Sequence, residues 1–269
     1  MGHGLPAAQH AGRRADEFDP GDGQGGLAGI DLLRGRDLRL GVAVGADRQS
    51  LATDDQGRVA VRSALLSLYG ATHWHVFSLR GALSYAQSRI HTERDIVIGN
   101  HRASLSADEH AHHAEAFIEV GLPGDLPFGH IEPFLQVGRF VTRTGGFTER
   151  GDDATALSGA GAHDARSFGM AGLHWRTDTQ YGLGAGWRLQ GTAAVQHVDG
   201  AATVSRQVSL SGTDSFGTRA ASGAGTGVLA DLGLTVMPRP RLSLSVHLSH
   251  AETGASHDTG WRVQGLWQF

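Results

Sequence analysis

Apolar and polar residues alternate with a period of two along much of this chain. The clearest stretch is 241–249, in which every second residue is Leu or Val and the residues between are Arg, Ser and His. Successive side chains of a β-strand point to opposite faces, so this pattern predicts a strand with one apolar and one polar face. The same alternation predicts strands at 37–45, 77–85, 114–122 and 228–236, and weaker alternation predicts strands at 27–33, 58–71, 131–141, 166–176, 185–198 and 259–269.

The connections between these eleven predicted strands alternate in length. Short turns are expected at 34–36, 72–74, 123–130, 177–184 and 238–240, and long polar, Gly-rich loops at 48–57, 89–112, 144–165, 199–227 and 252–258. Outer-membrane barrels have short turns on the periplasmic side and long loops outside. The sorted loop lengths therefore favour an all-β fold, a transmembrane antiparallel β-barrel, over a soluble β-sandwich.

In such a barrel the polar faces of the strands line the interior. An Arg placed on the lipid face at the bilayer midplane costs about 2–4 kcal/mol, so charged residues in the strands are expected to point inward. The expected interior residues are Arg39, Arg80, Glu115, Glu119, Arg188, Asp231 and His247, together with Arg62 and Glu132. Two roles are open for them: a network that braces the wall, or a hydrophilic lining past which an unfolded chain slides.

Composition excludes several classes of protein. The 269 residues include 40 Gly and no Cys, and all 23 basic residues are Arg, interspersed with 27 acidic ones for a net charge of -4. No basic face of the kind that binds nucleic acid is evident. No apolar run reaches the ~18–20 residues of a membrane-spanning helix, and residues 1–10 lack the charged and apolar regions of a secretory signal.

The C-terminal strand has an aromatic face that ends on the last residue of the chain. Trp261, Val263, Trp267 and Phe269 share one side of the predicted strand, and Arg262, Gln264 and Gln268 share the other. A terminal aromatic residue on such a strand resembles the assembly signal of bacterial outer-membrane barrels.

The order of several segments resembles the β-barrel translocator domain of the autotransporter (type V secretion) family. The similar segments are 26–31 followed by 38–45, then 131–135, 146–150, 187–197 and the terminal Trp-Gln-Phe. The resemblance implies a twelve-stranded barrel in the outer membrane of a Gram-negative bacterium, without enzymatic activity or cofactor. It also implies three partners: the outer-membrane lipid bilayer, the outer-membrane barrel assembly machinery, and an N-terminal passenger polypeptide that the barrel anchors and exports.

The N-terminal region departs from this family pattern. We expect residues 1–26 to be a loop or remnant and residues 27–269 to be the barrel. Single-chain bacterial barrels have even strand numbers, whereas eleven strands are predicted, and the segment before them contains Pro6 and does not alternate. The first strand is therefore expected to be missing or degenerate, the chain to be the C-terminal piece of a longer protein, and the 269 residues alone not to close.

Other chemistry has weaker support. His73 with His75, and His110 with His112 and His113, invite a metal site, but a structural site needs three or four supported ligands, and solvated His side chains are the simpler interpretation. Asp153 and His163 suggest a barrel hydrolase, although no Gly-x-Ser-x-Gly elbow is present. The alternatives to a translocator are thus a small outer-membrane porin or channel, and then a barrel hydrolase.

Overall fold

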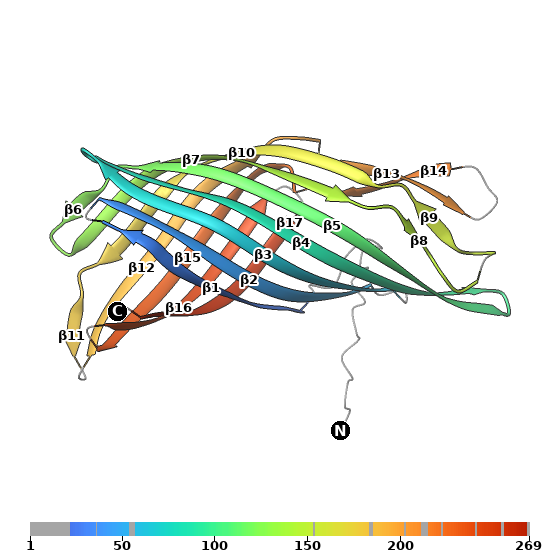
Figure 1. The fold of residues 1–269 in the computed structure, drawn as a ribbon, viewed down its shortest axis with the longest axis horizontal. Helices are drawn as coiled ribbons and strands as arrows, with labels where there is room; N and C mark the ends of the chain where they lie inside the picture. The colour runs from blue at the N-terminus through green and yellow to red at the C-terminus, as the bar shows by residue number, and fades with distance from the viewer. Residues whose placement is uncertain are drawn as a thin grey trace, which may run out of the picture.

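One long antiparallel sheet dominates the computed structural model, which describes residues 22–35, 37–53, 57–152, 154–182, 185–201, 203–210, 215–221, 223–239, 241–253 and 256–267. Each long strand pairs with the next one along the chain (Figure 1). These strands are β1 (Asp22–Arg34), β2 (Leu38–Thr53), β3 (Gly57–Trp74), β4 (Phe77–Ile98), β5 (His101–Gly121), β7 (Gly129–Thr144), β10 (Ala162–Thr177), β12 (Ala185–Val198), β15 (Gly225–Arg239), β16 (Leu242–Thr253) and β17 (Ser256–Trp267). All eleven predicted strands are confirmed, and β1 begins before the predicted residue 27.

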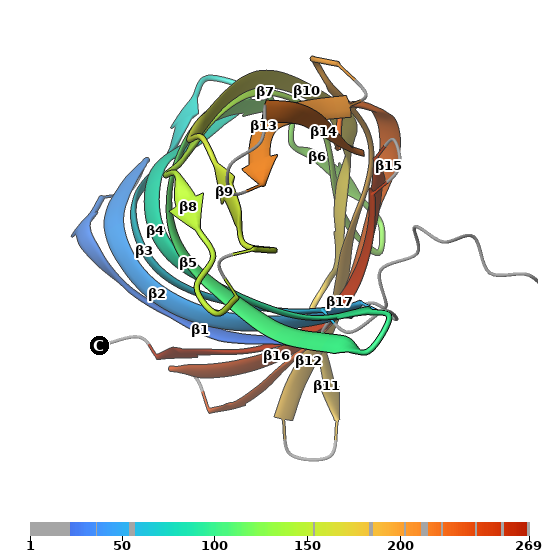
Figure 2. The same cartoon turned by 90° about the vertical axis from the view of Figure 1, so that its right-hand side faces the viewer.

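The sheet curls about the long axis of the molecule, so that the strands form a ring when viewed along that axis (Figure 2). Short strands β6 (Gly124–Leu126) and β11 (Gln180–Gly182) pair with β7 and β12 in the turns at one end. Within the described residues no ladder joins β1 to β17, and no helix is long and apolar enough to cross a membrane. The fold is therefore a curled antiparallel sheet with its polar face inside.

The two faces of the sheet differ as the alternation predicts. On β3, Leu66 and Leu68 are more than half exposed on the outer face, where they lie opposite Tyr85 and Leu83 of β4. Between them Ser67 points inward and hydrogen-bonds to Ser84 at 2.8 Å. Apolar side chains outside and hydroxyl groups inside reverse the arrangement of a water-soluble protein, as a lipid-facing wall requires.

The prediction of long loops was wrong in part, since much of 89–112 is strand. β4 and β5 continue outward as a paired hairpin whose two-residue turn contains Gly99, at φ 61°. On β5 the alternation continues through this extension, since the buried Ala103, Leu105 and Ala107 are separated by polar residues. The backbone groups of both strands pair throughout the extension.

Two further predicted loops build a small second sheet. Its strands, in the order β14 (Ser215–Ala221), β13 (Thr203–Leu210), β9 (Leu157–Gly159) and β8 (Phe147–Thr148), come from the segments that follow β12 and β7. Figure 1 shows them beside the extended ends of the long strands, and in Figure 2 β8, β9 and β13 lie within the outline of the ring. We call these four strands the mouth sheet.

Candidate functional site

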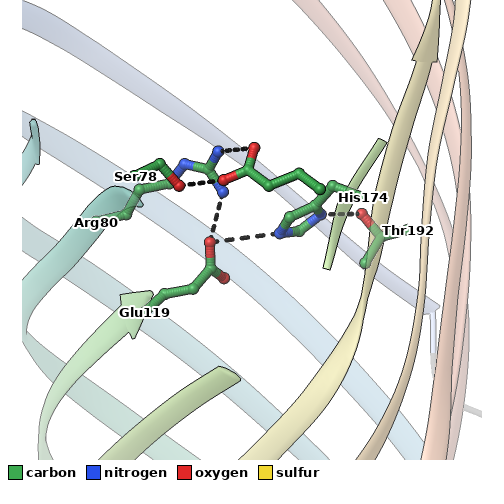
Figure 3. A network of polar contacts seen from close by, with 6 residues as sticks. Ser78, Arg80, Glu119, His174 and Thr192 are labelled. Atoms are coloured by element: carbon green, nitrogen blue, oxygen red, sulfur yellow. Dashed lines mark hydrogen bonds and ion pairs between the residues drawn. The ribbon is translucent and has the colours of Figure 1, made fainter. Parts of the chain in front are cut away.

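A network of charged side chains crosses the inner face of four strands. Arg80 of β4 donates from Nη1 to Oε1 of Glu119 on β5 at 2.5 Å. Its Nη2 donates to Oε2 of Glu132 on β7, also at 2.5 Å. One guanidinium therefore bridges two carboxylates, and Glu119 also lies 3.4 Å from Nε2 of His174 on β10. We call Arg80, Glu119, Glu132 and His174 the wall network (Figure 3).

Neighbouring side chains hold the wall network in place. Ser78 donates a hydrogen bond to Glu132, and Nδ1 of His174 lies 2.8 Å from Oγ1 of Thr192 on β12 (Figure 3). The His174 ring also stacks on Phe134, with the ring centroids 4.1 Å apart. Because each polar group has a partner on another strand, the network ties β4 to β12 on the inside of the sheet.

A second polar cluster lies on β12, β15, β16 and β17. Nδ1 of His247 is 2.7 Å from Oδ1 of Asp231, and its Nε2 is 3.0 Å from the side-chain nitrogen of Gln190. Arg262 lies 3.8 Å from the other Asp231 oxygen. Gly233 leaves room for this imidazole, since an added Cβ would come within 2.5 Å of the His247 ring.

Both clusters border one interior cavity of about 600 Å³. Its lining includes Arg39 of β2, Arg80, His174, Gln190, Asp231 and His247. Strands as far apart in the sheet as β2 and β16 can share a cavity only because the sheet curls around it. The interior is therefore a polar space enclosed by an apolar outer surface.

The structure brings most of the expected interior residues to this space. Arg39, Arg80, Glu119, Asp231 and His247 lie on the cavity or in the clusters beside it. Glu115 shares the inner face of β5 and lies 3.7 Å from His113. Arg188, on β12, is partly buried, and its Nε has no hydrogen-bond partner within the described part of the chain.

The expectation that Arg62 faces the interior was wrong. Arg62 has the same parity on β3 as Leu66 and Leu68, and like them it is exposed on the outer face. It lies opposite Arg48 of β2 and Arg89 of β4. The parity itself shows this placement, since Arg62 is four positions from Leu66 and six from Leu68.

The aromatic face of the C-terminal strand points outward. Trp261 and Val263 are more than half exposed on β17 and lie opposite Leu248 and Val246 of β16. Trp267 lies opposite Leu242 in the same ladder. Phe269 is outside the described residues.

The candidate metal and hydrolytic residues are not brought together. His112 faces outward and bonds to Tyr85 at 2.8 Å, whereas His113 faces inward and bonds to Thr142 at 2.9 Å. The described residues contain no group of three or more His, Asp and Glu side chains close enough to hold a metal ion. His163 and its neighbour Asp164 likewise point to opposite faces of β10, and Asp153 lies outside the described residues.

Arg206 fastens one side of the mouth sheet to the long hairpin. Arg206 of β13 forms a bidentate pair with Glu109 of β5, with N···O distances of 2.8 and 3.0 Å. It also donates to the backbone oxygens of Ala160 and Gly145 and lies 4.7 Å above the Phe147 ring. Four partners from three segments converge on this guanidinium, which makes it the main polar anchor of β13.

A second ion pair anchors the other side of the mouth sheet. Arg94 of β4 holds Glu149 bidentately at 2.7 Å, and Glu149 also accepts the backbone N–H of Leu157 at 2.8 Å. Burial opposes ionisation of Glu149, but these hydrogen bonds outweigh it and hold the pKa of Glu149 below its usual range. Because the folded pKa is depressed, the pair stabilises the mouth sheet above the unfolded pKa and loses this effect as pH falls through the folded pKa.

We therefore expect acid to loosen the mouth sheet before the rest of the barrel. Limited proteolysis of the folded protein between pH 7 and pH 3 should show cleavage near 149–157 appearing as the pH falls below about 4.5. Glu149→Gln, which removes the titrating group, should be cleaved there already at neutral pH. A cleavage pattern of the wild type that is independent of pH would contradict the role assigned to Glu149.

Sequence reasoning missed the mouth sheet and the partners within the wall network. It also missed the long β4–β5 hairpin, for which the Gly99-Asn100 pair was an available signal, since a two-residue Gly-containing turn marks a hairpin. Nothing in the sequence indicated that β9 pairs with β13, because these strands are short and belong to different loops.

Comparisons with known proteins agree with the geometry. The family model described as the autotransporter beta-domain matches residues 4–249. An extracellular serine protease of Serratia marcescens is 31% identical over 157 residues, which is 58% of this chain but only 15% of that protein. The chain therefore spans a small part of that relative's length.

Two solved structures have a similar fold. The translocator domain of the autotransporter NalP from Neisseria meningitidis superposes with a TM-score of 0.70 at 18% identity, covering 93% of this chain and 80% of that one. The β domain of the Bordetella autotransporter BrkA gives a TM-score of 0.60 at 16% identity, covering 93% and 91%. At these identities the likeness shows the fold alone.

Proposed function

The chain belongs to the autotransporter β-domain family of outer-membrane β-barrel translocators of Gram-negative bacteria, and from this we propose that it anchors an N-terminal passenger polypeptide and provides the route of its export. The observation that carries the proposal is the polar cavity of about 600 Å³ inside a sheet whose outer face is apolar. An unfolded chain carries unpaired backbone groups, which lipid cannot satisfy but a wet, polar interior can.

We propose that some of the charged interior residues brace the wall and that others form the hydrophilic lining, the two roles that the sequence left open. The wall network is fully paired, so Arg80 and its carboxylates brace the sheet from β4 to β10. Arg39, on the far side of the cavity, is about half exposed, and its ion pair within the described residues is with Asp31, at 3.5 Å. It belongs to the hydrophilic lining past which a passenger slides.

We further propose that the chain has no enzymatic activity of its own and needs no cofactor. The name of the Serratia relative describes that whole protein, of which the matched segment is a small part. Export then draws on folding and assembly of the passenger and barrel. The proposed partners are the lipid bilayer, the passenger, and the barrel assembly machinery. The machinery would recognise the outward side chains of Trp261, Val263 and Trp267 together with the terminal residue Phe269.

Surface display of a tag tests the translocator function. An epitope placed ahead of residue 1 in the natural reading frame should reach the cell surface, where protease added to intact cells removes it. The same frame ending at residue 253, without β17, should leave the tag protected, because the wall then lacks its last strand and the aromatic face. A tag that stays protected while the wild-type barrel inserts and conducts ions would instead indicate a channel.

A further inference from the structure

Three arginines and a histidine form a continuous row on the outer face of the sheet. Arg48 of β2 lies directly opposite Arg62 of β3, Arg62 opposite Arg89 of β4, and Arg89 opposite His110 of β5. All four side chains are exposed. Directly opposite residues have Cβ atoms about 4.5–5.5 Å apart, and like charges at that spacing destabilise a sheet.

No counter-charge in the described part of the chain offsets this repulsion. None of the three guanidinium groups has a hydrogen bond or an ion pair there. The outward acids beside the row, Asp108 and Glu93, line the same depression but contact His91, at 2.8 and 3.3 Å. By contrast, Arg80 in the interior and Arg206 in the mouth sheet are each paired with carboxylates. The row is therefore a concentration of positive charge that the protein itself leaves open.

The row lies at one border of the apolar outer belt. On β3 the belt runs from Trp74, which is 68% exposed, through Leu68 and Leu66, and Arg62 is the first charged residue above it. A strand rise of about 3.3 Å per residue and a tilt of about 40° place Arg62 roughly 30 Å above Trp74 along the membrane normal. The apolar band of such barrels is about 25 Å tall. With Trp74 at the periplasmic interface, the row lies at the level of the outer-leaflet headgroups.

The surface at the row is hollowed and suits an anion. A depression of about 740 Å³ is lined by the row together with Arg58, Ser50 and His91. Three acids also line it, but Glu93 and Asp108 contact His91 and Glu109 is paired with Arg206. Arginine presents planar N–H forks that bind phosphate oxygens bidentately. Just below the depression, Ala46 and Ala64 lead to the exposed Val44 and Leu66. Phosphate above and acyl chains below is the layout of a lipid headgroup region.

We propose that Arg48, Arg62 and Arg89 form a binding site for the phosphate groups of an outer-leaflet glycolipid, with its acyl chains on the belt below. The proposal rests on the outer-membrane placement given under the proposed function. The occupant is a lipid and not a dissolved anion, because the charged row and the apolar belt meet at this point. Phosphate would remove the mutual repulsion of the row and so hold β2 to β4 together on the outer side.

Native mass spectrometry of the folded barrel tests this site with bisphosphorylated lipid A as the probe. We expect the wild type to retain lipid A at least ten times more than the same lipid without phosphates. The triple variant R48Q/R62Q/R89Q should lose that preference. The triple variant R34Q/R102Q/R241Q removes the same charge from exposed positions away from the row and should keep it.

Three outcomes would overturn the inference. They are equal retention of the two lipids by the wild type, equal loss in both triple variants, and displacement of lipid A by 10 mM inorganic phosphate, which would assign the row to a free anion. Each variant is first checked for insertion by its heat-modifiable gel mobility. A wild type expressed in its natural reading frame that fails to insert contradicts the proposed function, whereas an inserted wild type without phosphate preference contradicts only the lipid site.

Discussion

Replacing Leu68 with Arg should destabilise the folded barrel by about 2–4 kcal/mol in lipid vesicles, because the new charge lies near the middle of the lipid-facing belt. Leu68 is about half exposed on the outer face, with Val42 and Leu83 opposite it on the two neighbouring strands. The free energy of unfolding in urea, followed by tryptophan fluorescence, measures the change.

The adjacent residue supplies the control for this substitution. Ser67 points inward, in the same cross-strand row as Ser84 and Glu115. Ser67→Arg places the same charge in the polar interior and should cost less than about 1 kcal/mol, the value of the lost hydroxyl hydrogen bond. Equal losses for the two variants would mean that the outer face is not the lipid face.

Removing the guanidinium of Arg80 should cause the second large loss in the free energy of unfolding. Arg80→Ala leaves Glu119 and Glu132 without their shared cation, and uncompensated buried charges cost about 3–5 kcal/mol. The Arg80 side chain is about one-third exposed, so solvent screening reduces the expected loss to about 2 kcal/mol. Arg80→Lys should lose less, because lysine keeps the charge but cannot bridge two carboxylates with a planar fork.

A weaker pair on the same face provides the comparison. Glu115 contacts His113 at 3.7 Å, and both side chains are more than one-third exposed. Glu115→Ala should therefore change the free energy of unfolding by less than about 0.5 kcal/mol. If Arg80→Ala were as mild as Glu115→Ala, the wall network would not brace the sheet.

The long strands were predictable because each has one face in contact with lipid. The alternation of Leu242, Leu244 and Val246 on β16 results from that contact. For β12, the alternation predicted both ends of the strand correctly, at 185 and 198. The extension of β5 also alternates, with Ala103, Leu105 and Ala107 buried beside the segment that follows β8, but the polar residues between them led to the expectation of a loop. Arg62 was assigned to the wrong face because its charge was given more weight than its parity. An outward charge is tolerated there because Arg62 lies at the border of the apolar outer belt of β3.

Three of the four members of the wall network were predictable, but His174 and the pairing of the four residues were not. Arg80, Glu119 and Glu132 were all expected to face the interior, yet their contacts depend on the register of β4, β5 and β7. A shift of one residue in any of these ladders would turn the side chain to the other face. The stacking of His174 on Phe134 depends in the same way on the ladder between β7 and β10.

The mouth sheet also has a consequence for the order in which the parts of the fold form. β9 pairs with β13, and Arg206 reaches back 97 residues to Glu109. Contacts over such long stretches of chain form late, because the intervening loops must first be ordered. We expect the sheet that narrows the opening to be among the last parts of the fold to form, so that the passage is widest early, while a passenger is still being threaded.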